Sequence, residues 1–264
     1  PEIRRLFPPL KSPTPVEEKI RIQEHVRRLL SWYAKRVILV DDDGIVPLNK
    51  TFEDNLYDRI VNLMEKEWGE ERVQRLLDEI YKILGKTLES WLFDDYFPYH
   101  LSLYKNRPIF WLLGIFPNRR KGNPPFACFL NFHKLTQDTL PKVRMLYLSR
   151  VIEETKIQYD NNIEDYSSMD SAERKSERGK RIAQVIAKLR ENLTLLEDLD
   201  RKIEGLTKPA NYLKPLEENA SWLERKIYEI TKKGYRPVLD YGVLVNVTPL
   251  KKAGILHKAS ERIK

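Results

Sequence analysis

The sequence contains little of several residues and patterns that mark common protein classes. Among 264 residues there is one cysteine, Cys128, so no disulfide forms within the chain and a reducing, cytoplasmic compartment is expected. The longest uncharged apolar run, residues 108–117, is about half the length needed to cross a bilayer, and we expect no membrane partner. The first residues do not follow the pattern of a signal peptide, and the chain opens on Pro1 without methionine, which suggests a piece of a longer polypeptide.

Glycine is also scarce, and this bears on a four-residue motif. The stretch NPPF, Asn123 to Phe126, is spelled like the catalytic tetrapeptide of enzymes that methylate amino groups of DNA bases. Such enzymes hold S-adenosylmethionine on a glycine-rich turn, because glycine lets the backbone approach the ligand closely. The ten glycines are never closer than eight residues apart, as at Gly114 and Gly122. We therefore favour a turn leading into a strand, and expect no cofactor in this chain.

Charged residues are abundant in the sequence, and basic residues outnumber acidic ones. Charged residues make up 33% of the chain, and the net charge is +8 with a pI near 9.3. A basic balance favours an acidic partner, with nucleic acid ahead of a membrane surface. The 41% of hydrophobic residues is enough for a sizeable core, so the chain is expected to be globular.

The patterning predicts a predominantly helical α+β fold, in which short helices surround a β-hairpin or small sheet. Residues 1–50 are predicted as a proline-rich linker, a first helix from Val16 to Arg36, a short strand at 37–40 and a tight turn at Asp43-Gly44. In residues 51–138 three amphipathic stretches end near Gly69, Gly85 and Tyr104. Two apolar strands, 108–116 and 126–132, then form the hairpin around a basic loop.

Long helices are predicted for residues 139–233. Apolar residues recur every seven positions from Ile182, and the segment 140–159 is the expected antiparallel partner, joined to it by a polar turn at 160–180. A third helix at 215–233 would complete the packing of this arm. Residues 234–264 are predicted as a strand and turn segment that packs back on the body. The expected stripe consists of Ile182, Val185, Leu189, Leu196, Leu199 and Ile203, interrupted by Asn192.

Three blocks carry a resemblance to a known family. They are NRPIFWLL at 106–113, NFHKLTQDTL at 131–140 and GYRPVLDYGVLVNVTPLKKAGIL at 234–256. In this order, with a helical arm before the last block, they resemble the C-terminal region of PglX-type adenine-specific DNA methyltransferases of BREX phage-defence systems, which are related to type II enzymes that fuse methylase and recognition domains. Tyr241 departs from the pattern, since the family often has a second aspartate there.

The resemblance implies that this chain recognises DNA while catalysis takes place in an upstream methyltransferase domain that holds S-adenosylmethionine. It also implies that the NPPF match is accidental, because the family's catalytic tetrapeptide lies upstream. The expected partners are double-stranded DNA, the upstream domain of the same polypeptide and other defence-system proteins. Two alternatives stay open: a helical module that binds other proteins of a defence complex, and a self-contained amino-methyltransferase that uses Asn123 to Phe126.

The candidate DNA contacts lie in and near the hairpin. Phosphates are contacted by Lys and Arg, and base edges are read by Arg and Asn. A solvated hairpin tip is the alternative for the loop. A second candidate is the arm's turn, with Arg174, Lys175, Arg178, Lys180 and Arg181, although the acidic residues between them favour a solvated helix. The predicted contacts are Asn118, Arg119, Arg120, Lys121 and Asn123, together with Arg107 and Lys134.

Metal chemistry is not expected. The four histidines share no ligand spacing, and both Glu-x-Lys matches fall on predicted helices rather than on a strand pair. A turn explains the acidic run Asp41 to Asp43 better than a divalent ion. His133 is predicted to be a structural histidine bonded to backbone, and Phe110 and Trp111 are predicted to be core residues.

Overall fold

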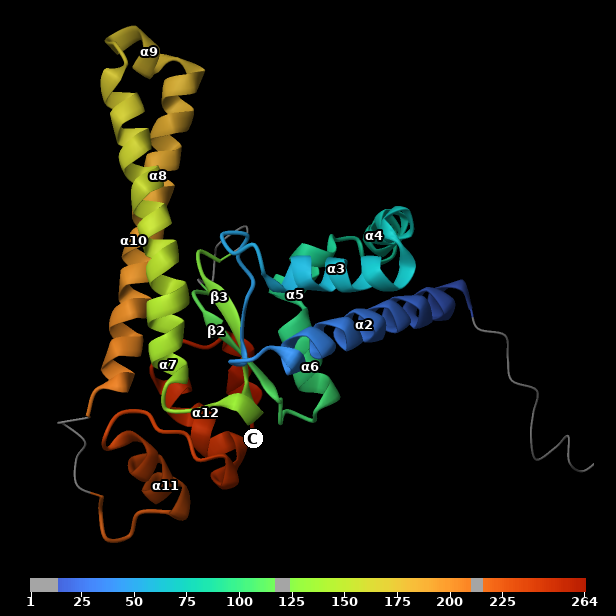
Figure 1. Ribbon diagram of the computed structural model, residues 1–264, viewed down its shortest axis with the longest axis vertical. Helices are drawn as coiled ribbons and strands as arrows, with labels where there is room; N and C mark the ends of the chain where they lie inside the picture. The colour runs from blue at the N-terminus through green and yellow to red at the C-terminus, as the bar shows by residue number, and fades with distance from the viewer. Residues whose placement is uncertain (1–13, 117–123, 210–215) are drawn as a thin grey trace, which may run out of the picture.

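The computed structural model describes residues 14–116, 124–209 and 216–264, and within these it is predominantly helical with a small antiparallel sheet (Figure 1). The sheet lies at the centre, a long helical arm rises on one side of it, and shorter helices lie on the other side and below. The predicted fold class, a mostly helical α+β fold, is confirmed. The first half comprises α2 (Pro15–Val40), β1 (Ile45–Pro47), α3 (Leu56–Trp68), α4 (Glu70–Leu84), α5 (Leu88–Asp94), α6 (Tyr96–Leu103), β2 (Phe110–Gly114) and β3 (Ala127–Asn131).

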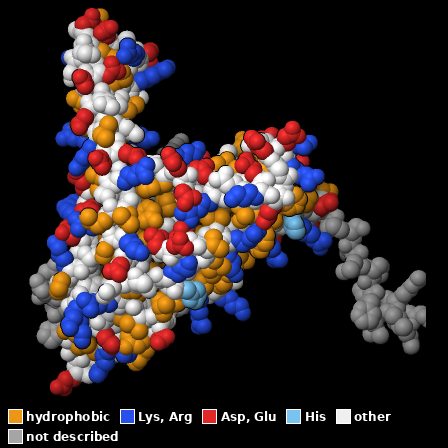
Figure 2. All heavy atoms as spheres, in the orientation of Figure 1, with side chains coloured by type: hydrophobic (Ala, Val, Ile, Leu, Met, Phe, Trp, Pro, Cys, Tyr) orange, Lys and Arg blue, Asp and Glu red, His pale blue; other side chains and the backbone are white. Residues whose placement is uncertain are grey.

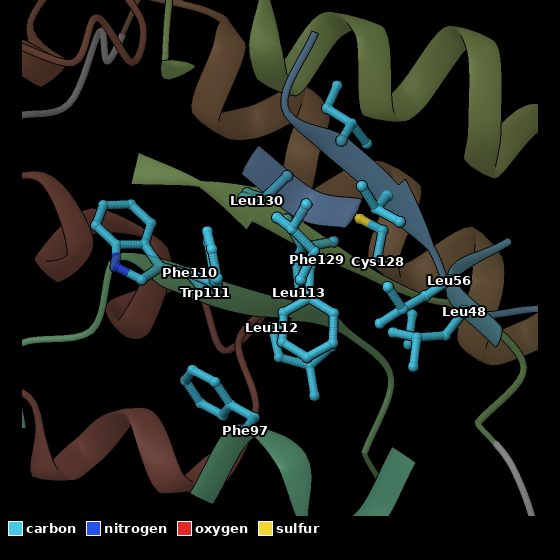
Figure 3. Packing of buried hydrophobic residues seen from close by; sticks show 14 of the residues in the cluster. Leu48, Leu56, Phe97, Phe110, Trp111, Leu112, Leu113, Cys128, Phe129 and Leu130 are labelled. Atoms are coloured by element: carbon cyan, nitrogen blue, oxygen red, sulfur yellow. The ribbon is translucent and has the colours of Figure 1, made fainter. Parts of the chain in front are cut away.

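The predicted hairpin is confirmed as the pairing of β2 with β3. The register joins Phe110 to Asn131 and Gly114 to Ala127, and β1 pairs with the other edge of β3, so the strand order is β1-β3-β2. Every residue of the three strands is buried, including Phe110 and Trp111, and Cys128 is a core thiol (Figure 3). Both faces of the sheet are covered, which agrees with the apolar sequences of its strands up to the buried Asn131.

The predicted strand at 37–40 is wrong, because α2 continues to Val40. Thr14 and Glu17 form a capping box at its start and Pro15 occupies the first turn, so the N-terminus is well defined. At the other end Val37 and Ile38 are buried in the core. This packing outweighs the strand preference of β-branched residues.

Glycine ends the short helices as predicted. Gly69 and Gly85 follow α3 and α4 with φ of 85° and 73°, and the amide of Gly85 donates to the carbonyl of Tyr81. Helices α5 and α6 then lead to the start of β2. The third amphipathic stretch of the prediction, which ends near Tyr104, thus forms two helices that are divided at Asp95.

The predicted antiparallel arm is confirmed, and α9 (Ser171–Lys175) lies at its tip (Figure 1). The first half of the arm is a continuous helical segment formed by α7 (Thr139–Lys142), a π-helical turn (Val143–Leu148) and α8 (Ser149–Ser168). It packs on α10 (Glu177–Thr207), whose Leu189, Leu196 and Ile203 are buried. Val185 is 44% exposed, so its predicted place in the buried stripe is wrong. The helix also runs to Ser168, so the predicted turn at 160–180 is shorter than expected.

The last helices lie at the base of the arm, and two predictions about them are wrong. Helix α11 (Trp222–Thr231) packs on α12 (Gly242–Lys252) and does not run along the arm. Tyr241 joins them, because its hydroxyl donates to Glu229 at 2.7 Å and accepts from Lys226 at 2.9 Å. The predicted strand and turn segment is thus largely helical. Its last part does pair with the sheet, since Gly114 donates to the carbonyl of Ile255.

Asn246 holds the C-terminal segment in shape. Its side chain is fully buried, accepts from the amide of Val238 and donates to the carbonyls of Val238 and Gly242, all at 2.8 Å. One amide side chain therefore satisfies three backbone groups of the turn before α12.

We predict that Asn246→Ala lowers the free energy of unfolding by about 3 kcal/mol, because it leaves buried backbone groups of the turn without partners. Urea denaturation measures this. The control is Asn162→Ala on the arm surface, whose single exposed hydrogen bond to Gln158 predicts a change of about 0.5 kcal/mol or less. Equal effects of the two substitutions would contradict the role given to Asn246.

Candidate nucleic-acid interface

The predicted DNA contacts belong to opposite ends of the hairpin. Arg107 and Lys134 lie where β2 begins and β3 ends, since Phe110 pairs with Asn131. Phe116 and Pro124, which flank the basic loop, lie beyond the Gly114 end of β2. A five-residue strand separates the two ends by about 15 Å. The predictions for Asn118, Arg119, Arg120, Lys121 and Asn123 concern residues outside those that the structure describes.

Lys134 is engaged within the protein. Its ammonium group donates to the backbone carbonyl of Asp41 at the end of α2, and its side chain is half-buried. Gly44 makes this possible: its φ is 72°, and a Cβ atom there would lie 2.8 Å from that of Lys134. Lys134 therefore stabilises the turn before β1, which is a structural role.

Arg107 is exposed, and its side chain has no ion-pair or hydrogen-bond partner among the described residues. It follows a tight turn in which Lys105 and Asn106 both have positive φ, 50° and 63°. The turn is held by the amide of Asn106, which donates to the carbonyl of Leu101 at 2.9 Å. Non-glycine residues rarely adopt this conformation. The turn places the exposed side chain of Lys105 two residues from Arg107.

Two more cations from distant parts of the chain come to the same place. Lys35 of α2 lies over the ring of Tyr104, 5.8 Å from its centroid, and Arg262 donates to the carbonyl of Pro98 in α6 at 3.4 Å. The C-terminal residue is adjacent, since the amide of Lys264 donates to the carbonyl of Asn106. We call Lys35, Lys105, Arg107 and Arg262 the basic corner. In the described part of the chain none of these four side chains forms an ion pair with a carboxylate.

A column of rings supports the basic corner from inside. Tyr104 lies 4.6 Å from His100, and His100 stacks on Phe110 at 4.8 Å between ring centroids. The Nε2 atom of His100 accepts from the amide of Phe110 at 3.3 Å, which fixes α6 to the start of β2. Burial, together with the nearby ammonium of Lys35, lowers the pKa of His100 to about 3, so the ring is neutral at pH 7.

Unlike the cations of the basic corner, two cations at the arm's tip pair with carboxylates, and a third bonds to nearby carbonyls. Arg174 donates to the carbonyls of Tyr166 and Ser167 at the end of α8, and Arg178 pairs with Asp165 at 3.1 Å. Lys180 pairs with Glu177. Three of the five predicted basic residues there are thus occupied, which favours the solvated-helix alternative. Figure 2 shows acidic and basic side chains interleaved along the arm, whereas Lys and Arg project from the lower right edge of the body.

The NPPF stretch has a structural explanation in the residues described. Asn49 donates to the carbonyls of Pro124 and Pro125 at 3.1 and 3.0 Å, and accepts from the amide of Ala127 at 2.8 Å. The ring of Phe126 is fully buried in the core. A buried ring does not stack on a flipped base, so this geometry argues against the self-contained methyltransferase.

The acidic run forms a turn, as predicted. The amide of Ile45 donates to the carboxylates of Asp41 and Asp43, and Asp41 pairs with Arg59. Burial opposes ionisation of Asp41, but Arg59, Asp43 and the amide of Ile45 together lower its pKa. Burial and the neighbouring Asp41 raise the pKa of Asp43, which accepts from the hydroxyl of Tyr147 in the arm. The described residues contain no cluster of three or more metal-ligating side chains.

His133 differs from its prediction. Its side chain is exposed, and its backbone amide donates a hydrogen bond to the side chain of Asn131. Its ring contacts Phe132, with 5.4 Å between centroids. The predicted structural bond of the histidine side chain to backbone does not appear in the described residues.

Sequence reasoning found Arg107 but missed its neighbours. Lys35 and Arg262 are distant in sequence, and only the three-dimensional arrangement of α2, α6 and the C-terminal segment joins them. A local signal did exist for Lys105, because it lies in the same short loop as Arg107, directly before the block 106–113.

Comparison with known proteins gives a partial match. The adenine-specific methyltransferase BrxX of Escherichia coli O9:H4 (strain HS) is 30% identical over 130 residues, which is 44% of this chain and 10% of the length of that protein. No family model matches the chain. The match supports a methyltransferase-related region in this chain. Among the described residues, no helix is long and apolar enough to cross a membrane.

We predict that His100 makes the stability of the fold depend on pH. Its pKa is 6.5 in the unfolded chain and about 3 when folded, so below pH 6.5 only the unfolded state binds the proton and stability falls. From pH 6.5 to 5 the loss from this residue is about 2 kcal/mol. In His100→Gln, which keeps an acceptor for the amide of Phe110, thermal or urea denaturation should show a correspondingly shallower pH dependence. His257, whose pKa burial lowers to about 4, is present in both proteins, so identical pH profiles would contradict a neutral buried His100.

Proposed function

We propose that this chain is the DNA-recognition part of an adenine-specific DNA methyltransferase of the PglX type, and that it acts in phage defence of the BREX kind. The basic corner is the observation that carries the proposal. Four cations from three separate segments meet there without an acidic partner among the described residues, and such cations are free to bind phosphates. The partial match to BrxX supports the methyltransferase relation.

In this proposal the chain binds duplex DNA and does not itself transfer the methyl group. The scarcity of glycine and the burial of Phe126 support a catalytic domain elsewhere in the polypeptide, which would hold S-adenosylmethionine. The whole protein would work in the cytoplasm, together with other defence-system proteins. The loop residues Arg119, Arg120 and Lys121 remain predicted phosphate contacts.

The arm supports a second candidate function, as a docking surface for other proteins of a defence complex. It extends well beyond the body (Figure 1), and Ile157 and Val185 on it are 53% and 44% exposed. Exposed apolar residues on a protruding helix pair are suited to protein contacts.

The test is fluorescence anisotropy with a labelled duplex of about 30 base pairs at several salt concentrations. We predict that log affinity falls linearly with log salt, and that the double variant Lys105→Ala/Arg107→Ala lowers the slope by about two, because two phosphate contacts are lost. Binding should weaken to a similar extent for unrelated sequences, since phosphate contacts carry no base information.

The matched control is Lys175→Ala/Arg181→Ala at the arm's tip, which also removes two exposed cations without described partners. It should leave the slope unchanged. No duplex binding at about 50 mM salt, where phosphate contacts are strongest, would contradict DNA recognition and favour the docking function of the arm.

A further inference from the structure

A second aromatic and cationic site lies away from the basic corner, where α2, α3 and α4 meet. The groove there measures about 310 Å³. Trp68, the last residue of α3, is 48% exposed in it. Gly69, with φ of 85°, makes the sharp turn into α4, so the first turns of α4 lie beside the indole ring. The lining residues are Leu29, Tyr33, Trp68, Arg72, Arg75, Leu76 and Glu79.

The indole of Trp68 is held in place by a chain of hydrogen bonds. Its Nε1 donates to the hydroxyl of Tyr33 at 2.7 Å, and this hydroxyl donates to Glu67 at 2.7 Å. Glu67 in turn pairs with Arg36 at 2.5 Å. Tyr33 is 1% exposed, so this series of hydrogen bonds is anchored in the core. The polar atom of the indole is thus satisfied inside the protein while almost half of the side chain faces solvent, as in a preformed stacking platform.

The groove also carries an excess of positive charge. Arg72 is exposed, and in the described part of the chain it has no ion-pair or hydrogen-bond partner for its side chain. Arg75 donates through Nε to the carbonyl of Glu71 at 3.3 Å, and its other guanidinium nitrogens have no partner among the described residues. Glu79 opposes them with a single carboxylate. Leu29 and Leu76 supply apolar walls.

We propose that this groove binds an unpaired nucleobase of single-stranded nucleic acid, with the base stacked on Trp68 and the adjacent phosphate held by Arg72 and Arg75. A fixed, half-exposed ring combined with cations is the arrangement that binds single strands without sequence preference. Trp and Arg also occur at protein interfaces, but the excess of cations over carboxylates in a groove of this volume favours a base with its phosphate. The proposal is carried by this groove alone and does not depend on duplex binding at the basic corner.

The test uses fluorescence anisotropy with a labelled single-stranded 12-mer of DNA and the whole chain. Trp68→Leu should weaken binding about tenfold, as expected for the loss of one stacked base. Arg72→Ala should lower the slope of log affinity against log salt by about 0.7, the value for one phosphate contact with a single strand. Because Arg72 has no described partner, this variant tests the site even if Trp68→Leu loosens the fold, which thermal melting would reveal.

Trp222→Leu and Arg190→Ala are the controls. Trp222 is 59% exposed on α11, and Arg190 is exposed on α10. The two control variants therefore remove the same types of side chain, a tryptophan and an arginine, from other surfaces. Competition with unlabelled dAMP distinguishes two sources of the same chemistry: displacement indicates a site for free nucleotides, and no displacement indicates that a strand is required.

Two results would overturn the inference: absence of single-strand binding at about 50 mM salt, or binding that Trp68→Leu and Arg72→Ala leave unchanged. Duplex binding and its dependence on Lys105 and Arg107 are measured separately. A protein that binds the 12-mer through Trp68 but binds no duplex would therefore contradict the proposed function and support this inference.

Discussion

Burial of β2 and β3 on both faces is the constraint on which the rest of the structure depends. No residue of these strands is exposed, so helices from distant parts of the chain must cover them, and the C-terminal segment must pair with the free edge of β2. Covering the start of β2 brings α2, α6 and the chain's last residues together. The basic corner is a consequence of this packing: α2, the turn that follows α6 and the last residues each contribute at least one cation.

The polar residues of the chain fall into two groups once their contacts are known. Asn246, Lys134 and Arg174 satisfy backbone carbonyls, and their contribution is to the fold. Arg107 and Arg72 have side chains with no such partner in the described residues. A polar side chain that already bonds to the protein gains little from a further partner. Arg107 and Arg72 have no such bond in the part of the chain that is described, so they are the residues that can gain binding free energy from an external anion. The blocks that resemble the methyltransferase family contain both kinds, so a family motif does not by itself identify a contact.

Local patterns predicted much of the fold. The hairpin, the helices that end at Gly69 and Gly85, and the arm all follow from signals within a few residues. The errors arose where tertiary packing overrides local preference. Val37 to Val40 and the valines of 243–247 favour strands, yet core burial of Ile38 and the three hydrogen bonds of Asn246 make both segments helical. Of the basic corner, only Arg107 was predicted from the sequence, and Lys35 and Arg262 reach it through long-range packing.

Hydrogen exchange of the backbone amides with and without a duplex is the direct test of phosphate binding at the basic corner. The amides of Lys105, Asn106 and Arg107 donate to carbonyls of α6 or its end, so phosphate binding at the basic corner should slow their exchange. We expect added protection across residues 101–110 that disappears at high salt. Protection confined to the arm's tip, with no change at residues 101–110, would contradict it.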